Sequence, residues 1–392
     1  MKHTADIVII GGGCIGTSIA WQLARRGAGR VVLLEKRMLA AGATGRTGAI
    51  VRTHYTHPVL ATMALYSRRV FENFSEAVGG APVFTRTGFL ALVSEPDAPA
   101  VRANVAMHRE LGIRAEALSP DDLAHLEPRL SLDGIGVAAW EPDSGYADGL
   151  RVTLAYADAA RREGVELRIG VDVEALVVGD DGVEGVQTSD GLVETERVVV
   201  AAGYRTHDLL RGVGLDLPMT PVWHDLAFVR RSEGFGAAHP VISDRVNGFF
   251  FRPDAGDVTR VGTTAPYDGW VDPNVEADAT PSRHELDRLA DGFTHRFPGA
   301  AALVGHGVAC AYDCTPDLQP VLGPATGIEG LYIAAGFSGH GFKLSPVVGE
   351  LMAETVLTGR TTLVDLDLFR LGRFAEGQPI ASDHAYTVAT LG

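Results

Sequence analysis

The first 35 residues alternate between apolar runs and glycine-rich stops in the order strand, helix, strand. An apolar, β-branched run at Ile7–Ile10 stops at three glycines, which is typical of a central parallel strand buried on both faces. Apolar residues then recur at helical spacing from residue 15 to residue 24. A second apolar run, at 31–34, ends at Glu35. The pattern predicts a βαβ unit of about thirty residues that opens the first domain.

Two later apolar runs predict returns to the same sheet. Residues 198–202 and 331–335 are apolar, and a glycine closes each run. The second run leads through FSGHGFKL into a predicted helix. Ser345 is its expected N-cap, Pro346 its first residue and Gly359 its C-terminal stop.

The segments between these returns have a different pattern. Residues 85–94 and 249–264 are strand-rich and carry turn signals. Antiparallel strands inserted between returns to a parallel sheet predict a second domain that is built from two insertions.

Composition narrows the class of protein. Of 392 residues, 46% are hydrophobic and 21% are charged, which excludes a disordered or collagen-like chain. The net charge is −15, so nucleic acid and anionic membranes are poor partners.

Three cysteines argue against a disulfide framework. No apolar run approaches the roughly 18 residues of a membrane span, and the first is too short for a signal peptide. We therefore expect a cytoplasmic protein without a membrane span.

Gly11, Gly13 and Gly16 form the pattern G-x-G-x-x-G between the first strand and the first helix. These glycines permit a tight turn, a close approach of the backbone to a pyrophosphate, and close packing of the helix on the sheet. The helix N-terminus favours the charge of that pyrophosphate. Glu35 follows at about the twenty-residue distance where a carboxylate accepts hydrogen bonds from an adenosine ribose. The motif predicts a dinucleotide site, and FAD and NAD share it.

The chain beyond this unit favours FAD, the longer cofactor. Residues 37–52 are rich in glycine, alanine and threonine and can wrap along an extended ligand. The glycine-ended segments AAGYR and AAGFSGHGF can supply further contacts. Ordinary turns after strands are the alternative interpretation of these segments.

Three segments make the chain recognisable: GFSGHGFKLSPVVGEL at 336–351, CAYDCTPD at 310–317 and IVRTHY at 50–55. It resembles the D-amino-acid-oxidase/glycine-oxidase superfamily of flavoproteins, and within it the sarcosine-oxidase group, over most of its length. The resemblance implies a fold of class α/β plus α+β, with a Rossmann-type FAD-binding domain and an inserted, mostly antiparallel β-sheet substrate domain. We expect the FAD-binding domain at residues 1–84, 146–215 and 310–392, and the substrate domain at residues 85–145 and 216–309.

The resemblance also implies roles for single residues. Arg52 and Lys343 match the two cations that hold the substrate carboxylate in sarcosine oxidases. A guanidinium can grip a carboxylate with two parallel hydrogen bonds, and an ammonium adds a point charge. Tyr55, Tyr312 and His340 fall on or beside active-site positions, where they would shape the pocket and keep the amine neutral. A structural ion pair or plain core packing is the alternative for each. The expected catalytic residues are Arg52, Tyr55, Arg260, Tyr312, His340 and Lys343.

Cys310 stands where monomeric sarcosine oxidases attach the flavin through a thioether, a bond that needs a thiolate. A small buried hydrophobe is the alternative for this residue. Covalent attachment therefore stays open, and Cys314 is expected to be structural. The expected cofactor-binding residues are Gly11, Gly13, Ile15, Gly16, Glu35, Lys36, Thr44, Gly203, Cys310, Gly336, Gly339, His340, Gly341, Phe342 and Lys343.

Three positions qualify the resemblance. Sarcosine oxidases carry a lysine that helps O₂ accept electrons, and Arg260 stands at that position here. A dehydrogenase, which uses another electron acceptor, is therefore an alternative to an oxidase. Thr264 replaces a pocket histidine, so the substrate can differ from sarcosine. His54 and His57 are three residues apart, but we expect no further ligands near them and hence no metal site.

The sequence thus predicts an FAD-dependent amine oxidoreductase. The substrate would be a small amino acid with a secondary, N-methyl or N-alkyl amine and a carboxylate held by the protein. A hydride would pass to flavin N5, water would hydrolyse the imine, and O₂ or another acceptor would reoxidise the flavin. The alternatives are an FAD-dependent 2-hydroxy-acid dehydrogenase of the same superfamily and a non-catalytic FAD-binding subunit. An NAD-dependent dehydrogenase would leave the segments CAYDCTPD at 310–317 and GFSGHGF at 336–342 unexplained. A homo-oligomer or a place in a larger complex is left open.

Overall fold

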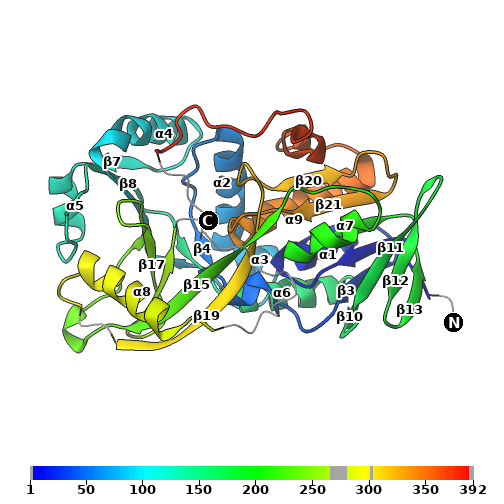
Figure 1. Ribbon diagram of the computed structural model, residues 1–392, viewed down its shortest axis with the longest axis horizontal. Helices are drawn as coiled ribbons and strands as arrows, with labels where there is room; N and C mark the ends of the chain where they lie inside the picture. The colour runs from blue at the N-terminus through cyan, green and yellow to red at the C-terminus, as the bar shows by residue number, and fades with distance from the viewer. Residues whose placement is uncertain (1–2, 265–279, 301–302, 388–392) are drawn as a thin grey trace.

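The computed structural model describes residues 3–264, 280–300 and 303–387. In this part of the chain, two large sheets lie at opposite ends of an elongated molecule (Figure 1). The α-helices are α1 (Cys14–Ala24), α2 (Pro58–Glu72), α3 (Phe74–Ala77), α4 (Ala98–Glu110), α5 (Pro120–Leu126), α6 (Gly149–Arg162), α7 (Thr206–Arg211), α8 (Arg283–Arg296) and α9 (Gly341–Thr358).

The first large sheet is parallel except at one edge, where β20 runs antiparallel. Its inner strands are apolar and buried on both faces, as parallel strands usually are. Ile7 and Ile9 face the helices, and Val8 and Ile10 face the opposite side. In spatial order the strands are β10 (Glu166–Ile169), β3 (Val31–Glu35), β2 (Ile7–Ile10), β14 (Val198–Val200), β21 (Leu331–Ala335) and β20 (Val321–Pro324).

Helices and a small sheet cover the two faces of this sheet. Helix α1 packs against α9 and α6 on one face. Residues of a four-stranded sheet share the apolar cluster on the other face. That small sheet contains, in order, β1 (His3–Thr4), β13 (Gly191–Glu194), β12 (Gly182–Thr188) and β11 (Val173–Gly179).

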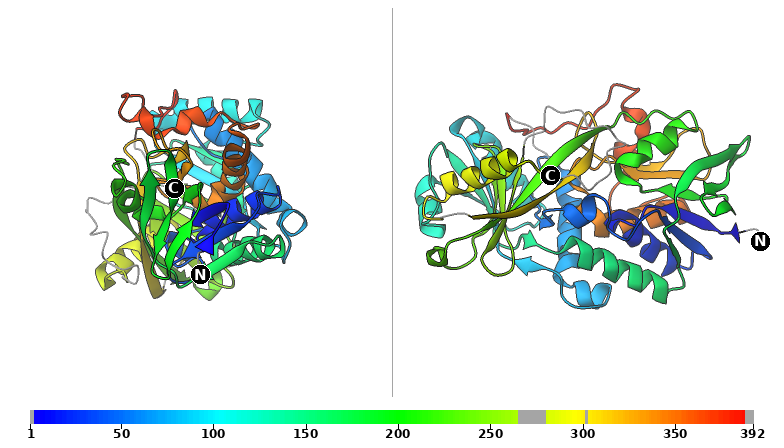
Figure 2. Two further views of the ribbon diagram at one scale, coloured as in Figure 1. Left: turned by 90° about the vertical axis from the view of Figure 1, so that its right-hand side faces the viewer. Right: turned by 60° about the horizontal axis from the view of Figure 1, so that its bottom comes forward.

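The second large sheet has eight strands, which are antiparallel except where β16 pairs with β6. Helix α8 packs on one face, where Phe293 and Phe297 join the core (Figure 2, α8 in yellow). In order the strands are β19 (Leu303–Cys314), β15 (Thr220–Arg230), β18 (Val258–Thr263), β17 (Phe249–Pro253), β16 (Val241–Asp244), β6 (Phe89–Val93), β8 (Val137–Glu141) and β7 (Glu116–Leu118). A three-stranded sheet contains β4 (Ile50–Val51), β9 (Gly145–Tyr146) and β5 (Thr85–Arg86).

These elements confirm the predicted fold class, a parallel α/β sheet with a mostly antiparallel sheet inserted between its strands. Strands β2 and β21 have the predicted bounds, whereas β14 ends at Val200 instead of residue 202. Strand β19 runs without a break through residues 309 and 310, where a domain boundary was predicted. The division into domains at the five stated segments stays a prediction.

The predicted start of the last helix is wrong. Helix α9 begins at Gly341, so Pro346 lies inside the helix rather than at its first position. A proline cannot donate to the carbonyl four residues earlier, which is that of Phe342. The Ser345 hydroxyl donates to this carbonyl instead, at 2.8 Å. The predicted end is confirmed, because Gly359 caps the helix with a φ of +69°.

No helix within the described residues is both long and apolar enough to cross a membrane.

Candidate active site

The glycine motif forms a tight turn from β2 into α1. Gly11 has a φ of +114°, and a Cβ atom there would lie 2.3 Å from the Ala201 carbonyl oxygen. A Cβ atom on Gly16 would lie 2.0 Å from the Gly11 carbonyl oxygen. The Thr17 amide donates to the Gly13 carbonyl at 3.0 Å, and the amides before it have no partner of this kind within the helix. The Gly12 and Cys14 amides donate to the side chains of Glu35 and Thr44, so the amides of Gly13, Ile15 and Gly16 are the donors of the turn without an oxygen acceptor among the described residues, as an anion site requires.

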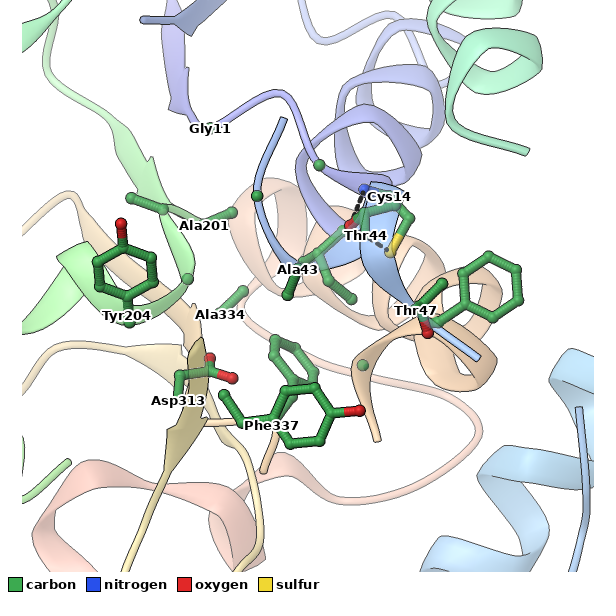
Figure 3. A pocket seen from close by; sticks show the side chains of 18 of the residues that line it. Gly11, Cys14, Ala43, Thr44, Thr47, Ala201, Tyr204, Asp313, Ala334 and Phe337 are labelled. Atoms are coloured by element: carbon green, nitrogen blue, oxygen red, sulfur yellow. Dashed lines mark hydrogen bonds between the residues drawn. The ribbon is translucent and has the colours of Figure 1, made fainter. Parts of the chain in front are cut away.

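A cavity opens in front of this turn, and we call it the glycine-loop cavity (Figure 3). Four of its wall residues, Thr47, Tyr312, Gly339 and Phe342, also line another cavity described below. Its walls are formed by Gly11, Gly12, Gly13, Cys14, Ile15, Glu35, Gly42, Ala43, Thr44, Thr47, Ala201, Ala202, Gly203, Tyr204, Ala311, Tyr312, Asp313, Ala334, Phe337, Gly339, Gly341 and Phe342. The predicted cofactor residues Gly11, Gly13, Ile15, Glu35, Thr44, Gly203, Gly339, Gly341 and Phe342 are among them.

Thr44 ties the segment after β3 to the start of α1. Its hydroxyl oxygen accepts from the Cys14 amide at 3.3 Å and lies 3.4 Å from the Cys14 sulfur (Figure 3). Burial raises the pKa of the Cys14 thiol to about 11, so this thiol is neutral. Cys14 is thus a small neutral residue of the cavity wall.

Glu35 lies at the far end of the glycine-loop cavity, where a further cavity begins. Its carboxylate accepts from the amides of Gly12 at 2.7 Å and Arg37 at 2.8 Å. The predicted residue Lys36 also lines this further cavity, and its ammonium lies 3.7 Å from the Asp172 carboxylate. Each carboxylate oxygen has two lone pairs, so Glu35 retains acceptor capacity for the hydroxyls of a ligand.

Asp313, which the sequence analysis did not single out, fixes the loop before α9. Its carboxylate accepts from the Gly336 amide at 2.8 Å, and its carbonyl accepts from the Ser338 amide at 3.2 Å. Burial raises the pKa of Asp313 to about 6, against the opposing effect of these backbone donors. The residue lies inside CAYDCTPD, so the signal was present, but nothing in the sequence showed which residue of that segment holds the loop.

Arg52 and Lys343 line a separate cavity, the arginine–lysine cavity, which adjoins the first through the four shared wall residues. Their side chains come from the segment after β4 and from the first turn of α9. The walls are formed by Thr47, Gly48, Ala49, Ile50, Arg52, Phe89, His224, Ser243, Phe250, Thr263, Thr264, Tyr312, Gly339, Phe342 and Lys343. The structure thus brings together the predicted residues Arg52, Tyr312 and Lys343, with Thr264 in the same wall.

Both cations of this cavity are buried, with exposed fractions of 6% for Arg52 and 4% for Lys343. Burial lowers the pKa of Lys343 well below its usual range, and the charge of Arg52 lowers it further. The Arg52 guanidinium donates to the His54 carbonyl and lies 4.8 Å from the ring centre of Tyr55. No carboxylate of the described residues forms an ion pair with either cation. Buried charges without a partner are costly, so the cavity suits an anionic ligand.

An aromatic stack forms the opposite wall, and its centre is His224, which the sequence analysis missed. The imidazole lies between Tyr312, with ring centres 4.5 Å apart, and Phe250, with ring centres 5.8 Å apart. Neither ring nitrogen has a hydrogen-bond partner among the described residues. Burial lowers the pKa of His224 to about 4, so the ring is neutral near pH 7. Its signal was a polar residue in register with Val222 and Leu226 on one face of β15.

His340 and Tyr55 lie behind the wall of the arginine–lysine cavity. Each is 5% exposed, and their ring centres are 5.3 Å apart. Burial lowers the pKa of His340 well below its usual range, and the charges of Lys343 and Arg52 add to this effect. Burial also raises the pKa of Tyr55 to about 12. Both side chains are therefore neutral packing partners of the charged wall.

Two further predicted residues lie outside the cavity walls. Arg260 pairs with Asp254 at 2.7 Å and donates to the Thr47 carbonyl at 3.0 Å. Cys310 packs in a small cluster with Val222, Tyr312 and Cys314, and burial raises the pKa of its thiol to about 12. Gly16 and Gly336, which also lie outside the walls, fix the turn and the loop instead.

The expectation that no further ligand-type side chains lie near His54 is wrong. His108 of α4 and Glu141 of β8 lie beside it, with one potential ligand atom from each of the three residues within 4.8 Å of the others. His57 is not part of this group, because its Nδ1 atom accepts from the Val59 amide and caps α2. Helix α4 and strand β8 approach residue 54 only in the tertiary structure, so spacing in the sequence did not reveal the group.

Comparison with known proteins gives a consistent result. The sequence model of the family described as DAO, FAD dependent oxidoreductase, matches residues 6–355. The chain is 28% identical to dimethylglycine dehydrogenase of Rattus norvegicus, over 96% of this chain and 46% of the relative. It is 29% identical to 4-methylaminobutanoate oxidase (formaldehyde-forming) of Paenarthrobacter nicotinovorans, over 90% of this chain and 43% of the relative. It thus spans about half the length of these curated relatives. Among solved structures, L-proline dehydrogenase from P. horikoshii is 27% identical, covers 96% of this chain and 100% of its own, and gives a TM-score of 0.87.

Proposed function

The chain belongs to the DAO family of FAD-dependent oxidoreductases, and from this premise we propose that it oxidises a small amino acid with a secondary, N-methyl or N-alkyl amine. One observation carries the proposal: Arg52 and Lys343 are buried beside a cavity with no carboxylate partner among the described residues. A substrate carboxylate supplies the missing anion. The names of dimethylglycine dehydrogenase and L-proline dehydrogenase fit this substrate class.

The glycine-loop cavity fits the cofactor of the family. The glycines keep side chains out of the turn, and the amides of Gly13, Ile15 and Gly16, which have no oxygen acceptor among the described residues, would bind its pyrophosphate. Glu35 would accept from ribose hydroxyls, and the loop that Asp313 fixes would lie against the ring system. When bound, FAD supplies the two-electron acceptor for the reaction.

The protein's own groups would orient the substrate and control its protonation. Arg52 and Lys343 would hold the carboxylate, which leaves the amine toward the aromatic stack around His224. A neutral imidazole in a buried wall can accept a hydrogen bond from the substrate amine, and its pKa of about 4 keeps it from taking up the proton itself. The substrate loses a hydride and a proton, and water then hydrolyses the resulting imine to an amine and a carbonyl compound.

We extend the proposal to the electron acceptor. The positive charge of Arg260 is paired with Asp254 and fixed at the Thr47 carbonyl. Arg260 stands where the resemblance to sarcosine oxidases places the lysine that helps O₂ accept electrons, and with its charge paired it would not take over that role. We therefore expect an acceptor other than O₂ to support faster turnover. A cytoplasmic location and an oligomeric or multi-subunit state also stay predictions.

Anaerobic titration of the FAD-loaded protein tests the proposed substrate class. Sarcosine, N,N-dimethylglycine or proline should bleach the flavin absorbance, while methylamine, which lacks the carboxylate, should not. Bleaching by lactate but by none of the amines would favour the 2-hydroxy-acid dehydrogenase. A flavin that neither substrate class reduces would favour the non-catalytic subunit.

A thioether from Cys310 is the finer part of the cofactor proposal. Cys310 lies on β19 two residues before Tyr312, a wall residue of both cavities. Its pKa of about 12 predicts that attachment during reconstitution with FAD becomes faster as the pH rises, because the thiolate is the reactive form. Acid precipitation should leave the yellow colour in the pellet. The variant Cys310→Ser should release it, and the matched variant Cys314→Ser should not. Colour in the wild-type supernatant would contradict the attachment.

A further inference from the structure

Residues 52–55, which carry Arg52, are buried but irregular. They follow β4 and precede α2, so no strand pairs with their backbone. Side chains bind this backbone instead. The Thr53 amide donates to the Glu141 carboxylate at 2.9 Å, and the Tyr55 carbonyl accepts from His108 at 2.7 Å. A buried backbone group without a partner is costly, so these two bonds, together with the one from the Arg52 guanidinium to the His54 carbonyl, hold the segment in place.

Glu141 is the centre of this arrangement. It ends β8 and is 1% exposed. One of its oxygens accepts from Thr53 and also from the Ser144 hydroxyl at 2.7 Å. The other oxygen has no hydrogen bond and lies 3.7 Å from Nδ1 of His54 and 4.0 Å from Nδ1 of His108. We call His54, His108 and Glu141 the Glu141 cluster.

The Nε2 atoms of His108 and His54, which do not contact Glu141, also have hydrogen-bond partners. His108 donates through Nε2, because a carbonyl can only accept, and this leaves its Nδ1 as an acceptor when the ring is neutral. Nε2 of His54 lies 2.6 Å from the hydroxyl of Tyr386. The cluster therefore joins α4, β8 and the end of the described chain around the segment that carries Arg52.

A metal ion does not suit the Glu141 cluster, although its atoms are of the ligand type. A single carboxylate offsets only half the charge of a divalent ion, and a buried charge left over is costly. Arg52 and Arg245 already stand close. Burial lowers the pKa of His54 well below its usual range, and the charges of His108, Arg245 and Arg52 lower it further. The surroundings thus disfavour additional positive charge.

On the premise of the function proposed above, we propose that Glu141 and His108 are positioning residues that aim Arg52 at the substrate carboxylate. Neither residue is a wall residue of the glycine-loop cavity or of the arginine–lysine cavity. They hold the backbone immediately after Arg52, and the direction of its side chain follows from that backbone. A displacement of about 1 Å in a positioning contact can cost a hundredfold in rate or affinity.

The test compares two variants of Glu141 in the FAD-loaded protein. Glu141→Leu removes the acceptor of the Thr53 amide, and Glu141→Gln retains an acceptor without the charge. The measurement is the dissociation constant of acetate, read from the visible spectrum of the bound flavin. We expect Glu141→Leu to weaken acetate binding about tenfold or more and Glu141→Gln to restore most of the affinity. The limiting rate of flavin reduction by saturating amine should change less than threefold in both.

Glu127→Leu is the matched control. Glu127 is also buried, but it pairs with Arg129 away from both cavities, so its replacement should leave the acetate affinity unchanged.

Each outcome has a distinct meaning. Glu141→Leu protein with wild-type acetate affinity would overturn the proposal. If Glu141→Leu retains no FAD, His108→Phe takes its place, because it removes the bond to the Tyr55 carbonyl with a ring of similar shape. Unchanged affinity in that variant would overturn the proposal equally.

A stoichiometric divalent metal in the wild type that is lost in His108→Phe would overturn it in favour of a metal site. Wild-type protein that binds acetate but is reduced by no amine would overturn the proposed function alone. A flavin that acetate does not perturb would overturn both.

Discussion

The glycine-loop cavity and the arginine–lysine cavity lie side by side but are built in different ways. The walls of the first are mostly glycine and alanine, so its backbone faces the ligand, and they come mainly from loops after β2, β3, β14 and β21, with residues 311–313 of β19. The walls of the second are side chains from β4, β6, β15 to β19 and α9. A backbone site can be recognised from a short motif, whereas a side-chain site exists only after distant strands have been brought together.

The two cavities also differ in charge. The first relies on amide donors and the start of α1, which favour an anion at little desolvation cost. The second holds two buried cations without a carboxylate partner among the described residues. The first therefore offers a pre-formed cradle, and the second holds an electrostatic imbalance that a ligand corrects. Substitutions in the two cavities should accordingly have separable effects, on cofactor retention and on substrate affinity.

The largest expected effect is the loss of the cofactor in Gly11→Ala. An alanine would have to adopt a φ of +114°, and its Cβ would lie 2.3 Å from a backbone oxygen. We expect the purified variant to retain no FAD, as judged by the ratio of absorbance at the flavin band to that of the protein. Gly234→Ala is the control, since Gly234 is exposed, lies outside the walls of both cavities and leaves a Cβ atom free of any neighbour within 4 Å. Normal flavin content in Gly11→Ala would contradict the view that the backbone of the glycine turn builds the cofactor cavity.

Next in size is the effect of Arg52→Met. Removing one partner of a buried charge pair costs about 2–5 kcal/mol, so the dissociation constant of an amino-acid substrate should rise about 100-fold. The flavin content should stay normal, because Arg52 does not line the glycine-loop cavity. The flavin absorbance before and during anaerobic substrate titration measures both quantities. Arg129→Met, at a distant ion pair, should behave as wild type. A joint loss of flavin and substrate affinity would show that the two cavities are not separable.

A smaller effect is expected for His224→Phe. Phenylalanine keeps the stack with Tyr312 and Phe250 but removes the neutral ring nitrogens. We expect the limiting rate of flavin reduction to fall about tenfold, which corresponds to the loss of one hydrogen bond worth about 1.4 kcal/mol. Stopped-flow measurement under anaerobic conditions gives this rate. His306→Phe is matched, because His306 also stacks on an aromatic ring, that of Phe228, outside the cavity. An unchanged rate would show that His224 only packs against its neighbours.

The smallest effect is that of pH on carboxylate binding. The ammonium form of Lys343 holds the carboxylate, and its pKa lies well below the usual value. Acetate affinity should therefore fall several-fold as the pH rises through this lowered pKa. His224, with a pKa of about 4, and Tyr55, with a pKa of about 12, keep their neutral forms between pH 7 and 10. The fall should disappear in Lys343→Met, and a fall that persists there would assign the titration to another group.

The sequence predicted more of the glycine-loop cavity than of the arginine–lysine cavity. G-x-G-x-x-G, Glu35 and the strand at 331–335 were predicted in place, because each depends on the local backbone. The start of α9 was predicted wrongly, because the Ser345 hydroxyl makes a proline acceptable inside the helix. Arg52 and Lys343 were predicted from resemblance, and the structure places both in one wall.

What the sequence alone determined is therefore the parallel sheet, its glycine turn and the family to which the chain belongs. These follow from patterns over a few neighbouring residues, where backbone geometry and side-chain size decide the conformation. Only the tertiary structure placed His224 in the stack, paired Arg260 with Asp254 and gathered His54, His108 and Glu141. Pairing and burial of such groups depend on elements far apart in the chain, and a side chain's charge and partners are fixed only when those elements meet.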